Sequence, residues 1–195
     1  MNEQQIEFWL DRLIAGDQEA FEAVYGMTRK KVYGTVAVLV RNREDVAEIV
    51  SEIYYQLWRS LPNYDRKRPF LFWLNGIVIR QVSQWRRQIW RRFRLHEKKA
   101  RLGEEAHVEM PDEPLLEAES NREIREAINR LPFKLRIVVI YRYYYDYSHD
   151  QIAELLQIPV GTVKSRNRLA LKRIRKWFDT ERDGEGFQIV YLKKN

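Results

Sequence analysis

The sequence predicts an all-α protein built from two small helical domains that an acidic linker joins. Apolar residues recur at three- and four-residue spacing along most of the 195-residue chain, and alternating strand patterns are nearly absent. The charge also reverses along the chain. Residues 80–101 hold nine Lys or Arg and one acid, whereas residues 104–126 hold nine acids and two Arg, beside Gly103, Pro111 and Pro114. At about 100–200 residues per domain, the length suits one or two domains.

Four helices are predicted in the N-terminal half from apolar residues at helical spacing. Their apolar faces span residues 6–14, 21–39, 46–61 and 70–85. Gly16 closes the first helix, and Asp17 can cap the second. Asn42 starts the third helix, which Pro62 stops. The fourth helix follows the turn-like stretch 62–69 and becomes strongly basic.

Shorter helices are predicted in the C-terminal half, at 115–130, after Pro132, at 152–156 and at 160–178. Pro132 can occupy the first turn of its helix, and Ser148 with Gln151 forms a capping box. We therefore expect domains at 1–97 and 115–178, a linker at 98–114, and a tail at 179–195 with no evident packing role.

The composition narrows the function classes. With 35 Lys and Arg against 28 Asp and Glu, the formal net charge of +7 favours nucleic acid, an anionic membrane or an acidic protein as partner. The chain has no Cys, which excludes disulfides, thiolate nucleophiles and Cys-ligated zinc. Its three His residues have no metal-ligand spacing, and no Gly-rich phosphate loop, GxSxG or HExxH motif is present. We therefore predict no enzyme, no metal and no cofactor.

The N-terminus is acidic at position 3 and lacks the layout of a signal peptide. The longest apolar runs reach five residues, against about 18 for a membrane span. We therefore expect a cytoplasmic protein without membrane insertion. The basic stretch 86–101 contains interleaved apolar residues, so binding to a membrane surface is a rival for DNA contact there.

The segment 148–173 has the spacing of a helix-turn-helix. Such a motif needs a small residue where its helices cross, a turn residue four positions later and an apolar residue six beyond, and Ala153, Gln157 and Val163 fit. Gln157 stands where a left-handed conformation favours Gly, at a cost of about 1 kcal/mol. The second helix would bury Val163 and expose a basic face suited to a major groove. A solvated basic helix in an ordinary bundle is the alternative.

Both halves of the chain carry motifs of one family. They are SHDQIAELLQIPVGTVKSR at 148–166, GDQEAFEAVY at 16–25, DVAEIVSEIYYQLW at 45–58 and WLNGIVIRQVSQWRR at 73–87. The first resembles the fourth conserved region of bacterial sigma factors of the extracytoplasmic-function (ECF) group, in the sigma-70 family, and the others resemble the second. The resemblance spans about residues 6–178. It implies a sigma factor that binds core RNA polymerase and directs promoter-specific initiation, with domain 1–97 as region 2 and domain 115–178 as region 4.

The resemblance implies four interfaces, two on each domain. The third helix would dock on the polymerase β′ coiled coil through Asp45, Glu48, Glu52, Tyr55 and Trp58. A solvated acidic face is the plainer interpretation of that helix. Minus-ten DNA would be captured and melted by Asn63, Tyr64, Phe70, Trp73, Arg80, Gln84, Trp85, Arg86 and Arg87. Among these, Trp73 fits a core role as well as a stacking platform, and Tyr64 is the better stacking candidate.

The fourth region would bind the polymerase β flap and the minus-thirty-five duplex. Lys164, Ser165 and Arg168 are expected to read bases, whereas Arg166, Lys172 and Arg173 are expected to contact phosphates. An anti-sigma factor is implied as a further partner. The acidic residues of the linker would occupy basic polymerase channels or would serve as a solubilising spacer.

The chain departs from the family pattern at four positions. Ser51 replaces a usual Gln, Arg80 a usual Asn, Gln84 a usual Asp, and Leu169 a position that is often Arg. The usual Asn lies beside the flipped base, so Arg80 leaves the preferred minus-ten base open. The rival function is a stand-alone, dimeric helix-turn-helix regulator, which would bind a palindrome without polymerase and would leave the N-terminal half unexplained.

Overall fold

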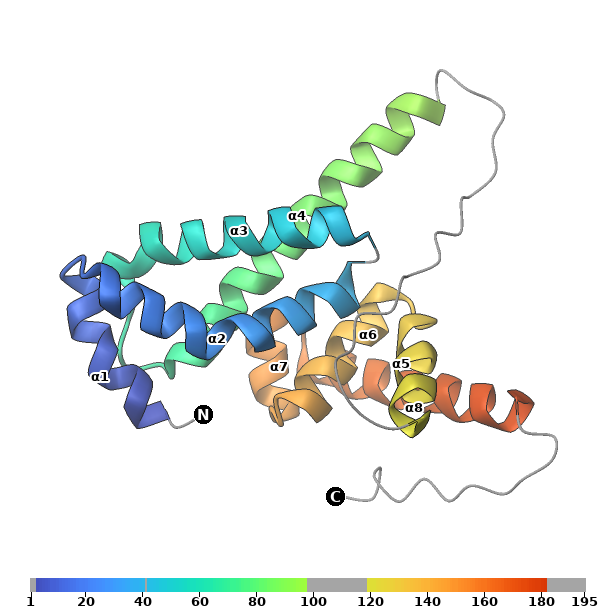
Figure 1. The fold of residues 1–195 in the computed structure, drawn as a ribbon. Helices are drawn as coiled ribbons and strands as arrows, with labels where there is room; N and C mark the ends of the chain where they lie inside the picture. The colour runs from blue at the N-terminus through green and yellow to red at the C-terminus, as the bar shows by residue number, and fades with distance from the viewer. Residues whose placement is uncertain (1–2, 41, 98–118, 182–195) are drawn as a thin grey trace. The chain divides into compact units, whose positions relative to one another are not determined.

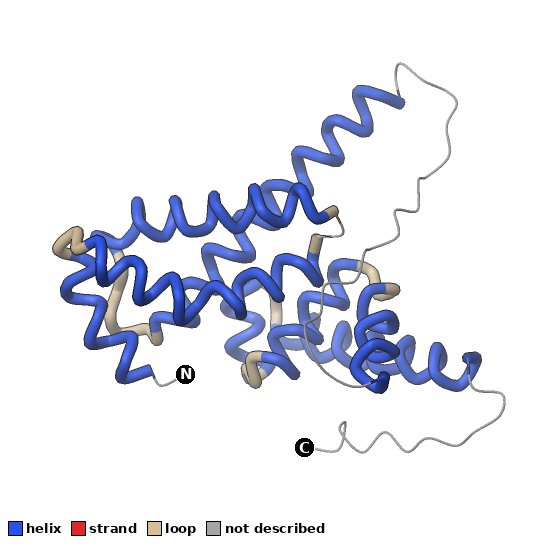
Figure 2. The backbone as a smooth tube through the Cα atoms, viewed as in Figure 1, coloured by secondary structure: helices blue, strands red, loops and turns tan. Residues whose placement is uncertain are grey.

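The computed structural model describes residues 3–40, 42–97 and 119–181, and every regular element in these ranges is helical (Figures 1 and 2). The elements are α1 (Glu3–Ile14), α2 (Gln18–Leu39), α3 (Arg43–Ser60), the 3-10 turn η1 (Leu61–Asn63), α4 (Phe70–Glu97), α5 (Glu119–Asn129), α6 (Phe133–Val139), the π-helical segment η2 (Ile140–Tyr144), α7 (His149–Leu156) and α8 (Val160–Glu181). The all-α prediction is confirmed. The predicted linker, 98–114, and residues 182–195 of the predicted tail lie outside the described ranges.

The described residues divide into two compact units, of which the first holds α1–α4 together with residues 154–157. Within it, α2 packs against α1, α3 and α4. The side chains at the centre are Val24 and Val36 of α2, Ile53 and Leu57 of α3, and Val78 of α4, each at most 1% exposed. The apolar faces predicted from spacing therefore meet in one core.

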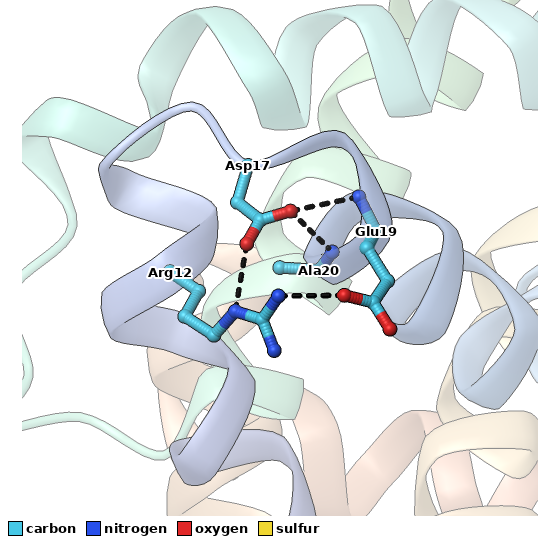
Figure 3. Close-up of polar contacts among 4 residues, drawn as sticks. All are labelled: Arg12, Asp17, Glu19 and Ala20. Atoms are coloured by element: carbon cyan, nitrogen blue, oxygen red, sulfur yellow. Dashed lines mark hydrogen bonds and ion pairs between the residues drawn. The ribbon is translucent and has the colours of Figure 1, made fainter.

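Polar side chains at the junction of α1 and α2 form hydrogen bonds with the free backbone N–H groups at the start of α2 (Figure 3). The Asp17 Oδ1 atom accepts from the backbone N–H groups of Glu19 at 2.9 Å and Ala20 at 3.3 Å, as a capping residue does. Arg12 donates to Asp17 Oδ2 at 2.7 Å and to Glu19 Oε2 at 2.6 Å. The hydrogen bond from Arg12 is the largest cause that lowers the pKa of Asp17. Gly16, with φ at +85°, makes the turn between the helices.

A buried hydrogen bond joins α2 to α3. Thr28 Oγ1 donates to the Val24 carbonyl at 2.7 Å, so its oxygen accepts from the Tyr54 hydroxyl at 2.9 Å. Burial raises the pKa of Tyr54 to about 12. The neutral phenol is therefore the form that fits this core.

The second unit has a core of Ala127, Leu131, Leu135, Val139, Ala170 and Ile174, which joins α5, α6 and α8. Pro132 was expected inside the first turn of its helix, but it stands at the N-cap of α6, where its carbonyl accepts from the N–H groups of Leu135 and Arg136. The sequence did not predict η2. In it, the Tyr145 N–H donates to the Ile140 carbonyl at 3.3 Å, five residues back. Tyr141 is fully buried at this point.

Candidate polymerase and promoter interfaces

The helix-turn-helix prediction rests on three positions, and the structure places each as expected. Ala153 is 6% exposed and Val163 is fully buried, so the small and apolar positions face inward. Gln157 adopts φ of +53°, the left-handed conformation that the turn requires. Ser148 and Gln151 exchange two hydrogen bonds, of 2.8 and 3.1 Å, and so form the predicted capping box at α7.

The outer face of α8 is basic. Residues 160–178 contain seven Lys or Arg and no acid. Among the predicted contact residues, Lys164, Ser165, Arg168, Lys172 and Arg173 are exposed, and Arg166 is half-buried. Leu169, the departure from the family pattern, is 45% exposed on the same helix. This side of α8 therefore offers cations together with one apolar surface residue.

A polar contact on the buried side of α8 was not predicted from the sequence. Asn167 is 9% exposed, and its amide nitrogen lies 3.4 Å from the Tyr143 hydroxyl and 3.5 Å from His149 Nε2. The pKa of His149 is lowered, first by burial and then by Arg142 and Lys164, so the neutral form of the imidazole is favoured at pH 7. His149 is half-buried, and its contact with Asn167 links α7 to α8.

The segment from η1 into α4 holds an aromatic cluster. The ring of Tyr64 lies 4.8 Å from that of Trp73 and 5.7 Å from that of Phe70, centroid to centroid. Asn63 is exposed, and Tyr64 and Trp73 are half-buried. Phe70 was predicted to face DNA, but it is 2% exposed, because its position in α4 points into the core. Phe70 therefore supports the other two rings from inside.

Further along α4, the predicted DNA-facing residues Arg80, Gln84 and Arg87 are exposed, whereas Trp85 and Arg86 are half-buried. Burial lowers the pKa of the Arg86 guanidinium below its usual value. Trp90, one of the apolar residues interleaved in the basic stretch 86–101, is 59% exposed and lines an open groove with Ser83, Arg86, Arg87 and Arg91. Its exposed indole suits either of the two roles weighed for that stretch, DNA contact and binding to a membrane surface.

The exposed side of α3 combines acids and aromatic rings, as predicted. Glu48 and Glu52 are exposed, Asp45 is half-buried, and Tyr55 and Trp58 are 56% and 42% exposed. Ser51, which replaces a usual Gln, is exposed as well. Phe21 of α2 packs edge-on against Trp58 at 5.6 Å, so the aromatic surface extends onto α2, which the sequence analysis did not foresee.

Within the described residues, no group of three or more potential ligand side chains could hold a metal ion. In the same ranges, no helix is long and apolar enough to cross a membrane.

Comparison with known families assigns both units. The family model "Sigma-70 region 2" matches residues 24–92, and "Sigma-70, region 4" matches residues 121–174. The chain belongs to the sigma-70 family. The region 2 match accounts for the N-terminal half that a stand-alone helix-turn-helix regulator would leave unexplained. This sigma factor therefore directs promoter-specific transcription initiation, and sigma factors as a class are non-enzymatic initiation factors.

Similar proteins place this sigma factor in the ECF group. It is 26% identical to the RNA polymerase sigma-H factor of Pseudomonas aeruginosa, covering 90% of this chain and 95% of the relative. It is also 26% identical to the ECF RNA polymerase sigma factor SigW of Bacillus subtilis, covering 89% and 97%.

Two solved structures share the fold of this chain. RpoE of Bartonella quintana, solved with the anti-sigma factor NepR, matches with a TM-score of 0.67 at 17% identity, covering 83% of this chain and 98% of RpoE. CnrH, solved with the cytosolic domain of CnrY, matches with a TM-score of 0.61 at 18% identity, covering 89% and 97%.

Proposed function

We propose that this sigma factor works through four interfaces on two domains, 1–97 and 115–178. The observation that carries the proposal is the presence on one chain of a helix-turn-helix with a basic outer face and a second unit that combines exposed aromatic rings with arginines. Two such surfaces suit two promoter elements that are read together in a complex with core polymerase.

The α3 face would bind the β′ coiled coil. Its exposed acids, Glu48 and Glu52, suit a basic partner, and the aromatic rings of Tyr55 and Trp58 add apolar contact area. Region 4 would bind the β flap, so that holoenzyme formation fixes the spacing between the two DNA-binding surfaces.

Minus-ten DNA would be held by two neighbouring parts of the first unit. Asn63 and Tyr64 would capture the flipped base, with Trp73 beside Tyr64. The exposed side chains of α4 between positions 80 and 87, which are Arg80, Gln84 and Arg87, would follow the single strand. Stacking on an aromatic ring contributes about 1–3 kcal/mol per base, which offsets part of the cost of unpairing.

At the minus-thirty-five element, we assign base reading to Lys164, Ser165 and Arg168. Phosphate contacts are assigned to Arg166, Lys172 and Arg173, whose positive charges suit phosphate oxygens. Phosphate contacts position the helix without specifying sequence, so the two groups have separable effects on binding.

We also propose that an anti-sigma factor regulates the protein. RpoE, which shares its fold, was solved with the anti-sigma factor NepR, and CnrH, which also shares it, was solved with the cytosolic domain of CnrY. The protein would act in the cytoplasm, without a cofactor and without catalysis of its own.

The test is transcription in vitro on fragmented genomic DNA, with bacterial core polymerase in the presence and absence of the protein. Start sites that require the protein and share two upstream elements are the expected result. If no new start sites arise with a matched core polymerase while the protein alone still binds DNA, the proposal is wrong and a stand-alone regulator is favoured.

A further inference from the structure

The tip of the segment between η1 and α4 is tied to α1 by an ion pair. Residues 65–69 are all exposed, so burial does not hold them in place. Arg66 Nη2 donates to Asp11 Oδ1, across 55 positions of sequence. Figure 1 shows this segment passing beside α1. The contact therefore joins the proposed base-capturing segment to the N-terminal helix of the domain.

Hydrogen bonds inside the segment set its shape but not its position. The Tyr64 hydroxyl donates to the Arg68 carbonyl at 2.6 Å, and Asp65 accepts from the N–H groups of Lys67 at 3.0 Å and Arg68 at 3.1 Å. These bonds close a local turn. The contact with Asp11 orients that turn relative to the helical core.

Helix α1 is a firm support for such a contact. Ile6, Leu10 and Leu13 are at most 3% exposed, so the helix is anchored along its inner face. Arg12, next to Asp11, pairs with Asp17 and Glu19 at the start of α2 (Figure 3). The region 2 family model begins its match at residue 24, so α1 precedes the matched residues.

We propose that Asp11 is a positioning residue for minus-ten recognition, because through Arg66 it holds the segment that carries Asn63 and Tyr64 in the orientation that admits a flipped base. The inference rests on the proposed function. Asp11 acts on DNA only through Arg66, since a carboxylate repels phosphate. The side chains of the pair are 74% and 54% exposed, so salt screens their attraction.

The test compares Asp11→Asn and Arg66→Gln with wild type, using the holoenzyme on a promoter mapped as above. Selectivity is the ratio of transcription from the preferred minus-ten sequence to that from a template substituted at the captured base. Fluorescence of 2-aminopurine at the captured position reports base unstacking independently. Glu19→Gln is the matched control, because it removes an acid and an ion pair of 2.6 Å at the junction of α1 and α2 without touching the segment.

We expect Asp11→Asn to lower selectivity about two- to five-fold, the range of an exposed ion pair, and the loss to shrink at high salt. Arg66→Gln should lower it similarly, and the double variant should lose no more than either single variant. Glu19→Gln should match wild type. Removing the Asp11 carboxylate makes the protein more positive, which strengthens its general attraction to DNA. Weaker attraction to DNA therefore cannot explain a fall in the selectivity of Asp11→Asn.

Wild-type selectivity in Asp11→Asn, or additive losses in the double variant, would overturn the inference. Absence of protein-dependent start sites with the wild type is a separate result, which refutes the proposed function and is measured first. Thermal melting of each full-length variant distinguishes a local change from unfolding: a Tm equal to that of Glu19→Gln, together with lowered selectivity, supports the positioning role.

Discussion

The turn of the helix-turn-helix contains a backbone penalty that one substitution removes. Gln157 has φ of +53° and an exposed side chain. A residue with a Cβ pays about 1–2 kcal/mol in this conformation, whereas Gly pays none but loses about 0.5–1 kcal/mol more conformational freedom on folding. We therefore expect Gln157→Gly to raise the free energy of unfolding by about 0.5–1 kcal/mol.

The assay is thermal and urea unfolding of the full chain, with hydrogen exchange of α7 and α8 to locate the change. For a domain of 60–100 residues, about 1 kcal/mol shifts Tm by about 4–8 °C, so the expected rise is about 2–8 °C. Arg175→Gly is the matched control. Arg175 is exposed within α8, where Gly costs about 1 kcal/mol, so the same new residue should act with the opposite sign.

The comparison with Gln157→Ala isolates the cause. Alanine retains a Cβ, so it should leave stability near the wild-type value, since the exposed Gln157 side chain has little packing to lose. If alanine stabilises as much as glycine, or if glycine destabilises, the backbone explanation is refuted.

Three further predictions address a buried hydrogen bond, the recognition helix and a helix cap. Tyr54→Phe removes the hydroxyl that bonds to Thr28 and should lower the free energy of unfolding by about 1 kcal/mol at pH 7. Because burial raises the pKa of Tyr54 in the folded state from 10.0 to about 12, the advantage of the wild type is full below pH 10 and is lost as the pH rises through 12. Urea unfolding at several pH values would measure this loss. Lys164→Ala should weaken binding to one promoter family more than to others, whereas Lys172→Ala should weaken all similarly and lower the salt slope by about 1, as titrations of holoenzyme at several salt concentrations would show. Asp17→Asn keeps a side chain that can cap α2 but removes its negative charge. Since the pKa of Asp17 is lowered from 3.8 in the folded state, the wild type should be the more stable protein above pH 3.8, and this advantage should vanish as the pH falls through the lowered pKa. Unfolding measurements below pH 5 would show the loss.

The local signals in the sequence predicted the helix boundaries well. Asp17 and Asn42 cap their helices, and Ser148 with Gln151 forms the capping box, because each interaction needs only residues within one turn. The same reason explains why the left-handed Gln157 could be predicted from spacing within the helix-turn-helix.

Burial of individual rings was harder to predict, although the sequence held part of the answer. Phe70 was assigned to the DNA surface from its place in the family pattern. Its spacing to Leu74 and Ile77 puts it on the inner face of α4, and all three are at most 4% exposed. The pattern of apolar residues in the helix was thus a better guide to Phe70 than position in the motif.

Contacts across long sequence separations gave no local signal. Two such contacts depend on how the helices pack: the ion pair of Asp11 with Arg66, and the contact of Asn167 with Tyr143 and His149. Each of these polar residues has many plausible partners in a chain with 32% charged residues. Only the arrangement of the helices selects one of them.

The structure also refines how Ser165 would read a base under the proposed assignment. Its hydroxyl donates to the Thr162 carbonyl at 2.9 Å, so the proton is already engaged within α8. The remaining lone pairs can accept a hydrogen bond, and in the major groove the donors are the amino groups of adenine and cytosine. Lys164 beside it can only donate, which suits guanine O6 and N7. Adjacent positions on one helix turn therefore favour opposite base edges, and this difference follows from a contact within the helix that the sequence motif does not reveal.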